Sequence, residues 1–303
     1  MKLVTWNTQW CCGMDGVASP RRIVEQARAL ADFDVLCLQE IAQGYGEMPG
    51  SPGDQPAELA ALLPGFQLFF GAAVEELATS GQRQRFGNLI ATRLPVLQVQ
   101  HHTLPWPADA GVRSMPRMAT VVTLRDPALG MLRVMTTHLE YYSGVQRMAQ
   151  ARALRALHIE ACAHATAPPA QDSSNSPFQS KPHTAQAILC GDFNLGPDEP
   201  EYAVIQEPFE GAPAAAQAAP APDAGVPPAV DPVTRRLQDA WPLVHGRAAH
   251  APTFRLFDRT YGPEPVACDF VFVSDTLAPR VRRIEIDPAT QASDHQPVWV
   301  ELG

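Results

Sequence analysis

The sequence has 303 residues, of which 46% are hydrophobic, so the chain can bury a large core. Its 23 basic and 32 acidic residues give a net charge of −9, which argues against a protein whose main task is to coat nucleic acid. No leader pattern precedes the first strand-like run and no apolar run reaches membrane-spanning length. We therefore expect a cytoplasmic protein without a transmembrane segment or an obligate protein partner. The six cysteines include no CxxC pair, so no zinc site is indicated.

Apolar runs of strand length recur along the whole chain and alternate with helical patterns. They predict strands at residues 3–5, 35–38, 88–92, 96–99, 119–124, 132–136, 188–190, 270–273 and 298–302. Short links with turn residues predict two hairpins, one within 88–99 and one within 119–136. Ser19 followed by Pro20 predicts the start of a helix, and an apolar stripe predicts a longer helix over 144–165.

Two stretches have the composition of flexible loops. Residues 166–186 are rich in Pro, Ser and Gln, and residues 208–232 form an Ala/Pro/Gly tract. Strand-like runs that one sheet system needs lie on both sides of these stretches. We therefore expect a single domain over 1–303, built from packed sheets covered by helices.

Acids, amides and a histidine stand where several of the apolar runs end. Asn7 and Glu40 close the first two runs, Asp192 and Asn194 follow the run at 188–190, and Asp294 and His295 precede the last run. If these ends meet at one rim, they form an oxygen-rich cluster of the kind that magnesium or manganese prefers. Each residue also has an ordinary structural explanation, because asparagine caps strands and Asx turns end them. The ordered set favours a phosphoryl-transfer site.

The same residues belong to motifs that resemble one family. The motifs are WN (6–7), LQE (38–40), GN (87–88), THL (137–139), GDFN (191–194), CDFVFVS (268–274) and SDH (293–295). In this order they resemble the endonuclease/exonuclease/phosphatase superfamily of metal-dependent phosphohydrolases. The resemblance implies an α+β, four-layer αββα sandwich, in which two mixed β-sheets lie face to face and are flanked by helices.

The resemblance also implies a role for each motif residue. It implies that Glu40, Asn7 and Asp294 bind Mg²⁺, with Mn²⁺ as an alternative. It implies that Asp192 activates water, that Asn194 and His138 contact the phosphate, and that Asp269 orients His295. Which of Asp192 and His295 is the base stays open. Asn88 matches a residue near the substrate cleft.

Further candidates come from the residues alone. Arg147 and Gln150, one helical turn apart, could face the cleft and bind phosphate, although a solvated helix face explains them equally well. Arg83, Arg85, Arg113 and Arg117 could form a local basic rim, with scattered surface arginines as the alternative.

Two departures from the family pattern bear on function. Gln9 stands where many nuclease members have an acid, and Ala267 and Cys268 precede Asp269 in place of a basic residue. The leading hypothesis is a magnesium-dependent phosphodiesterase of nuclease type, acting on a phosphoester that could be nucleic acid. The alternatives are a phosphomonoesterase, a lipid or inositol-phosphate phosphodiesterase, and a noncatalytic binding protein that retains the fold.

Overall fold

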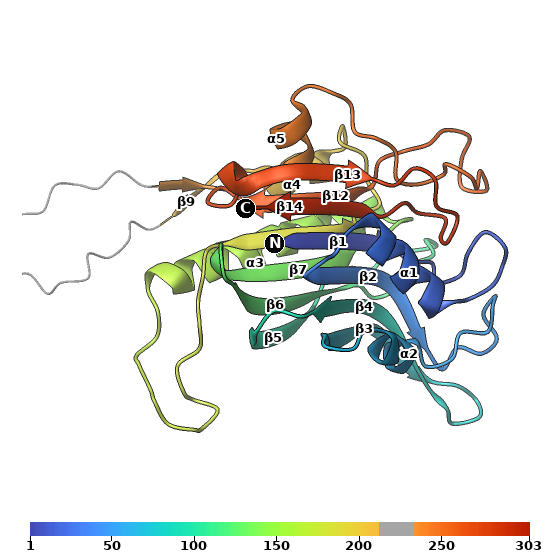
Figure 1. The fold of residues 1–303 in the computed structure, drawn as a ribbon, viewed down its shortest axis with the longest axis horizontal. Coiled ribbons are helices and arrows are strands. Elements are labelled where there is room, and N and C mark those ends of the chain that lie inside the picture. The colour runs from blue at the N-terminus through green and yellow to red at the C-terminus, as the bar shows by residue number, and fades with distance from the viewer. Residues whose placement is uncertain (212–232) are drawn as a thin grey trace, which may run out of the picture.

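Two six-stranded mixed β-sheets lie face to face in the computed structural model, which describes residues 1–211 and 233–303 (Figure 1). The first sheet has the order β13-β14-β1-β2-β4-β3 and the second β11-β12-β8-β7-β6-β5. The strands of the first sheet are β1 (Lys2–Asn7), β2 (Val35–Gln43), β3 (Gln67–Leu77), β4 (Arg83–Thr92), β13 (Val281–Ile286) and β14 (Val298–Leu302). Those of the second are β5 (Val96–Thr103), β6 (Met118–Asp126), β7 (Gly130–His138), β8 (Ala187–Asp192), β11 (Leu237–Asp239) and β12 (Asp269–Ser274).

One parallel strand pair lies at the centre of each sheet. β1 runs parallel to β2, and β7 runs parallel to β8, whereas the neighbouring strands are antiparallel. Parallel strands bring their carboxyl ends to the same edge of a sheet. The polar residues that end these four strands therefore gather at one end of the sandwich.

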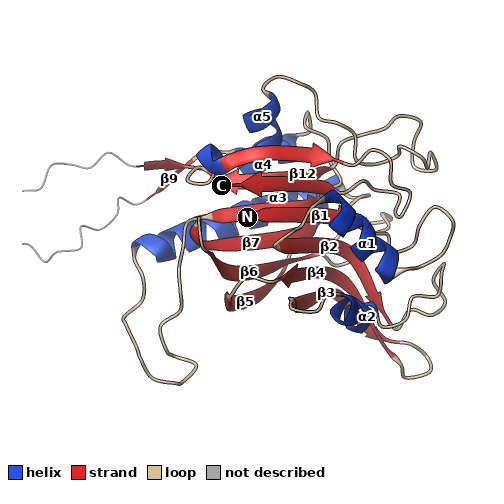
Figure 2. Ribbon diagram, in the orientation of Figure 1, coloured by secondary structure: helices blue, strands red, loops and turns tan. Residues whose placement is uncertain are grey.

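Apolar side chains fill three layers of core. The central layer lies between the sheets and includes Leu3, Cys37, Val122, Cys190 and Val300, all fully buried. The outer face of the first sheet packs against α1 (Pro20–Leu30) and α2 (Gln55–Leu62). The outer face of the second packs against α3 (Gly144–Thr166) and α4 (Pro200–Gln206). This arrangement confirms the expected αββα sandwich (Figure 2).

Smaller elements complete the described residues. α5 (Ala240–His245) contacts β12 and β13, and a 3-10 helix covers Ala278–Arg280. β9 (Phe209–Gly211) and β10 (Val233–Arg235) pair with each other as a separate two-stranded sheet. None of the helices in 1–211 and 233–303 has the length and apolar character needed to cross a membrane.

The helix starts follow the predicted capping chemistry. The Ser19 side chain accepts a hydrogen bond from the Arg22 backbone N–H, and Pro20 opens α1 without a missing hydrogen bond. The predicted helix at 144–165 is α3, capped by Ser143. The chain between α3 and β8, which contains most of the loop expected at 166–186, forms neither helix nor strand. Within the loop expected at 208–232, residues 209–211 form β9 and 212–232 lie outside the described residues.

One of the two predicted hairpins is wrong. β4 already pairs with β2 on one side and β3 on the other, so it has no free edge for β5. The chain instead crosses at 93–95 to the second sheet, where β5 pairs with β6. Arg93 fixes this crossing through hydrogen bonds of 2.9 Å to Asp34 and 2.8 Å to Asp32. The other hairpin, β6–β7, is confirmed.

Gly191, directly before the polar end of β8, is a position that only glycine tolerates. Its φ is +138°, and a Cβ atom there would overlap the carbonyl oxygen of Thr137 on β7. We expect Gly191→Ala to lower the free energy of unfolding by about 3 kcal/mol or more, because the parallel pair must separate. Gly196→Ala is the control, since a Cβ there meets only the Glu199 side chain at 3.8 Å. Equal denaturant midpoints for the two variants would contradict this account.

His158 of α3 makes stability depend on pH. It lies buried with Nδ1 2.9 Å from Nη2 of Arg133, and burial together with that arginine lowers the pKa of His158 to about 3. Since the pKa is lower in the folded state than in the unfolded state, the unfolded state takes up the proton first. Stability is therefore lost as the pH falls below about 6.5, by roughly 1.4 kcal/mol per pH unit.

Urea denaturation between pH 4 and 8 tests this linkage. His158→Gln keeps an acceptor for Arg133 but does not titrate, so the difference in stability between the variant and the wild type should shift in the variant's favour below pH 6.5. A difference that does not change with pH would show that His158 does not contribute.

Candidate active site

The site straddles the two sheets at the end of the sandwich where the parallel strands finish. Asn7 ends β1, His138 ends β7 and Asp192 ends β8. His138 is paired in register with Asp192, and Asp269, the first residue of β12, is paired with Asp192 on the other side. His295 reaches the same place from the loop before β14. The hydrogen-bonded pairing of the strands thus places these side chains together.

Glu40 reaches the site because β2 has a bulge. Leu38 pairs with Leu89 and Ile41 with Gly87, so Gln39 and Glu40 together oppose the single residue Asn88. Glu40 has a φ of +61°, which is uncommon for a residue with a side chain and is typical of bulges and functional sites. The bulge lets Gln39 hydrogen-bond Thr136 of the other sheet at 2.8 Å, while Glu40 contacts Asn7.

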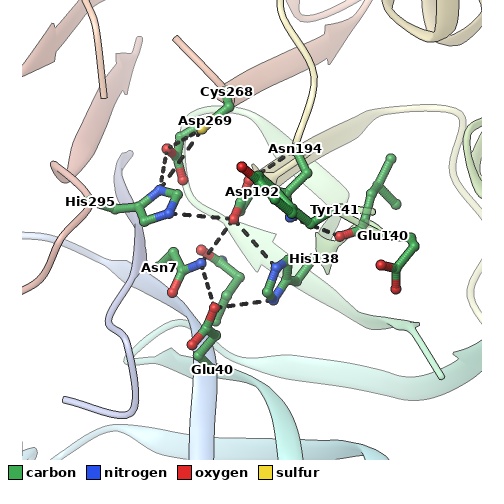
Figure 3. A network of polar contacts seen from close by, with 12 residues as sticks. Asn7, Glu40, His138, Glu140, Tyr141, Asp192, Asn194, Cys268, Asp269 and His295 are labelled. Carbon is green, nitrogen blue, oxygen red and sulfur yellow. Dashed lines mark hydrogen bonds and ion pairs between the residues drawn. The ribbon is translucent and has the colours of Figure 1, made fainter. Parts of the chain in front are cut away.

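The carboxylate of Asp192 is the centre of the polar network (Figure 3). Its Oδ2 accepts a hydrogen bond of 2.9 Å from Nδ2 of Asn7, and Oδ1 accepts one of 2.9 Å from the backbone N–H of Asn194. Nε2 of His138 lies 3.4 Å from Oδ2, and Nε2 of His295 lies 3.7 Å from it. The residue is 1% exposed. Burial raises the pKa of Asp192 to about 6, and the neighbouring His295 opposes that rise.

His295 is held at its ring edge, on one ring face and at its backbone. Nδ1 lies 2.9 Å from Oδ2 of Asp269, and the ring stacks on Phe254 with centroids 4.3 Å apart. Trp6 Nε1–H donates to the His295 carbonyl oxygen at 2.9 Å. Burial opposes the charged imidazole, but the carboxylates of Asp269 and Asp192 outweigh it and raise the pKa of His295 well above its ordinary value. A protonated His295 therefore faces an ionised Asp192 at neutral pH.

Glu40 and Asp294 form the acidic side of the site. Burial and the charge of Asp294 raise the pKa of Glu40 to about 7, and burial also raises the pKa of Asp294. Two buried carboxylates that repel each other supply oxygen ligands for a divalent cation, and the cation neutralises their charge. Nδ2 of Asn7 donates to Glu40 at 3.1 Å, and the amide oxygen of Asn7 accepts from the Gln9 backbone N–H at 3.1 Å. These residues fit a hard cation.

A second cluster has metal-ligand spacing but a different chemistry. Ligand atoms of Asp192, Cys268, Asp269 and His295 lie within 4.8 Å of one another. His295 and Asp269 already satisfy each other through their hydrogen bond, and burial keeps the pKa of the Cys268 thiol well above its ordinary value. A protonated thiol is a poor ligand. The oxygen-rich group around Glu40 is therefore the better fit for Mg²⁺ or Mn²⁺.

A cavity of about 610 Å³ opens onto these groups. Its inner wall contains Glu40, His138, Asp192, Asn194, Asp294 and His295. Its outer walls are largely aromatic or apolar and include Trp10, Tyr45, Met48, Phe86, Tyr141, Tyr142 and Tyr261. This volume is ordinary for a small-molecule site.

Of the remaining sequence candidates, Asn194 lines the cavity, whereas Asn88 and Arg147 do not. Asn194 has a φ of +51°, and its Nδ2 donates to the Leu139 carbonyl oxygen at 2.9 Å. Asn88 is buried opposite the bulge and donates to the Met118 carbonyl oxygen at 3.2 Å, outside the cavity lining. Arg147 is also outside the lining: it donates to the carbonyl oxygens of Glu140 and Tyr141 and pairs with Glu199.

Two cavity residues that contact candidate site residues had no role predicted from the sequence. Glu140 is fully buried and pairs with Arg117, whose Nε lies 3.2 Å away, and Phe254 covers His295. The position of Glu140 directly after the THL motif is a signal that sequence reasoning could have used. Phe254 lies in a long loop with no periodic pattern, and nothing around it in the sequence marks its contact with His295.

The chain belongs to the Endonuclease/Exonuclease/phosphatase family, whose model matches residues 4–295. Members of this family are usually phosphoester hydrolases, and they generally use a divalent metal. No curated protein matches the chain.

Solved structures share the fold over the whole chain at low sequence identity. An endonuclease/exonuclease/phosphatase from Beutenbergia cavernae is 23% identical, with a TM-score of 0.64 and coverage of 100% of this chain and 72% of that one. A mannosyl-6-phosphatase from Bacteroides thetaiotaomicron is 16% identical, with a TM-score of 0.63 and coverage of 100% and 99%. The human nocturnin catalytic domain with bound sulfate is 16% identical, with a TM-score of 0.58 and coverage of 100% and 93%.

The Asp269–His295 pair gives a direct spectroscopic prediction. Asp269→Asn removes a carboxylate that raises the pKa of His295, so we expect that pKa to fall. The pH titration of the His295 ring resonances by NMR, in the wild type and in the variant, measures it. An unchanged His295 titration would mean that Asp269 does not govern the imidazole.

Proposed function

We propose that this protein is a magnesium-dependent phosphoester hydrolase in which Asp192 activates water for in-line attack on phosphorus. The observation that carries the proposal is the place of the Asp192 carboxylate, which lies between a charged imidazole and the acidic group that fits a cation. A buried carboxylate with a pKa of about 6 is ionised at neutral pH. This pKa is also close to the operating pH, as an effective general base requires.

Each side chain of the network has a task in that reaction. Asp192 accepts the proton of the attacking water, and the Asn194 N–H and Asn7 Nδ2–H fix the orientation of its carboxylate. Glu40, Asp294 and Asn7 hold Mg²⁺, which when bound withdraws charge from the phosphate oxygens. Mn²⁺ has the same ligand preference and is the alternative metal.

The two histidines differ in charge and so in role. His295 is protonated and its Nε2 lies 3.7 Å from Oδ2 of Asp192, so we assign it to a nonbridging phosphate oxygen. Burial, with Arg117 nearby, lowers the pKa of His138 well below its ordinary value. A neutral His138 acts as a hydrogen-bonding group between Glu40 and the phosphate.

Two substrate classes follow from different observations. The sequence motifs favour a phosphodiesterase of nuclease type acting on a nucleic-acid phosphodiester. The cavity favours a small phosphoester, because its lining has five carboxylates, at residues 40, 76, 140, 192 and 294, against two arginines. This lining repels a long polyanion. The neighbour described as a mannosyl-6-phosphatase shows that the fold can serve a phosphate monoester.

Synthetic esters separate the classes at the first step. We expect hydrolysis of bis(p-nitrophenyl) phosphate or of p-nitrophenyl phosphate with MgCl₂ or MnCl₂, and loss of activity with EDTA. The diester, followed by single-stranded DNA, duplex DNA and RNA, tests the nuclease reading; the monoester, followed by sugar phosphates and inositol phosphates, tests the second. Inactivity on every ester by a folded protein that binds Mg²⁺ would reject both.

Asp192→Asn tests the assignment of the base. We expect kcat to fall by about 10²- to 10⁴-fold, because the amide cannot take a proton from water. The melting temperature should stay equal or rise, since the variant removes a buried charge. Asp198→Asn, an exposed acid on the same loop, is the matched control and should retain activity. Near-normal turnover of Asp192→Asn would reject this role.

A further inference from the structure

The cavity lining is poor in positive charge for a protein that takes a phosphate. Among the lining residues in the described part of the chain, Arg113 and Arg117 carry a permanent positive charge and no lysine is present. Arg113 is exposed, and its guanidinium lies over the Tyr142 ring at 5.5 Å. Arg117 is 6% exposed and lies inside the cavity. The two arginines therefore differ in how strongly water screens them.

The Arg117 guanidinium uses little of its hydrogen-bonding capacity within the protein. Nε donates to Oε2 of Glu140 at 3.2 Å. Nη1 is buried and has no partner among the described residues, and no residue of that part of the chain accepts a hydrogen bond from Nη2. Burying a guanidinium with its donors unmatched is costly. A bound ligand with acceptor oxygens would satisfy these free N–H donors of Arg117.

Glu140 cannot supply the missing acceptors, because its own oxygens are engaged. Oε1 accepts from the Tyr142 backbone N–H at 3.0 Å, and Oε2 accepts from the Met115 backbone N–H at 3.4 Å in addition to Arg117. The Glu140 backbone N–H is in turn fixed by Oε1 of Gln150 at 2.9 Å. Glu140 therefore binds only Nε of Arg117, and neither Nη1 nor Nη2 has an acceptor among the described residues.

The register of the second sheet places Arg117 beside the reaction site. Ala119 of β6 pairs with Thr137 of β7, so Arg117, directly before β6, lies next to the chain segment that carries His138 and Glu140. Arg117, His138 and Glu140 line the same cavity as Asp192. The guanidinium thus stands on the far side of His138 from the Asp192 carboxylate.

We propose that Arg117 is a substrate-binding residue that donates from the nitrogens not used by Glu140 to an oxygen of a phosphoryl group held in the cavity. This inference rests on the proposed function and adds to it a positively charged contact with the phosphoryl group, from the residue directly before β6. A planar guanidinium matches the geometry of phosphoryl oxygens in a way that an ammonium group does not.

The test compares Arg117→Lys with the double variant Arg117→Gln/Glu140→Gln. The lysine keeps a positive charge beside Glu140, and the double variant removes the ion pair without leaving a lone buried carboxylate. Arg125→Lys, at an exposed position near the other end of β6, is the matched control. Melting temperatures first establish that each variant is folded.

Binding of inorganic phosphate, measured by calorimetry with saturating Mg²⁺, is the direct readout. We expect Kd to rise by about tenfold or more in both Arg117 variants and to stay unchanged in Arg125→Lys. KM for the best phosphoester should rise in parallel, and more than kcat falls. Pyrophosphate binding is measured in the same way. If the Arg117 variants lose more affinity for pyrophosphate than for phosphate, Arg117 also contacts a second phosphoryl group.

The outcomes keep this inference apart from the proposed function. Folded Arg117 variants that bind phosphate with the wild-type Kd would overturn the inference, as would a wild-type protein that binds no phosphate at millimolar concentration. If phosphate affinity depends on Arg117 but no ester is hydrolysed, the proposed function fails and the Arg117 contact stands.

Discussion

The burial of one ionised carboxylate, that of Asp192, governs the arrangement of the polar end of the sandwich. A charge that is 1% exposed is costly unless hydrogen-bond donors and opposite charge surround it. Here the donors are Asn7 Nδ2 on the first sheet and the Asn194 backbone N–H directly after the second sheet's β8, while His295 supplies the charge. The face-to-face packing of two sheets is therefore a requirement of the site as well as of the core.

Much of the fold and of the candidate site could be predicted from sequence, because both produce changes from apolar to polar residues between neighbours in the chain. Asn7, Glu40 and Asp192 each interrupt an apolar run, and a polar residue at the end of a buried strand is conspicuous. Local patterns also predicted the helix start at Ser19, from the Ser19-Pro20 pair, and the long helix over 144–165, from its apolar stripe. These signals depend on neighbouring residues, so they are visible without the tertiary structure.

The features that could not be predicted depend on which strand edges are already occupied and on distant contacts. The pairing of β5 with β6 follows from the position of β4 between β2 and β3, which no local pattern reveals. β3 and β13 are only partly buried, so their apolar alternation is weak and they were missed. The Arg117–Glu140 pair joins residues 23 positions apart, and the stacking of Phe254 on His295 comes from a loop.

The pairing of β1 with β14 has a consequence for how the protein matures. Lys2 pairs with Glu301, so the first and last strands lie side by side (Figure 1), and at the other end of β1 Trp6 donates to the His295 carbonyl oxygen. During synthesis β1 is made long before β14 and keeps one unpaired edge until β14 has left the ribosome. His295 lies directly before β14 in the sequence, so the polar network around Asp192 stays incomplete until that segment has been synthesised. Contacts of such long sequence separation form late and slowly.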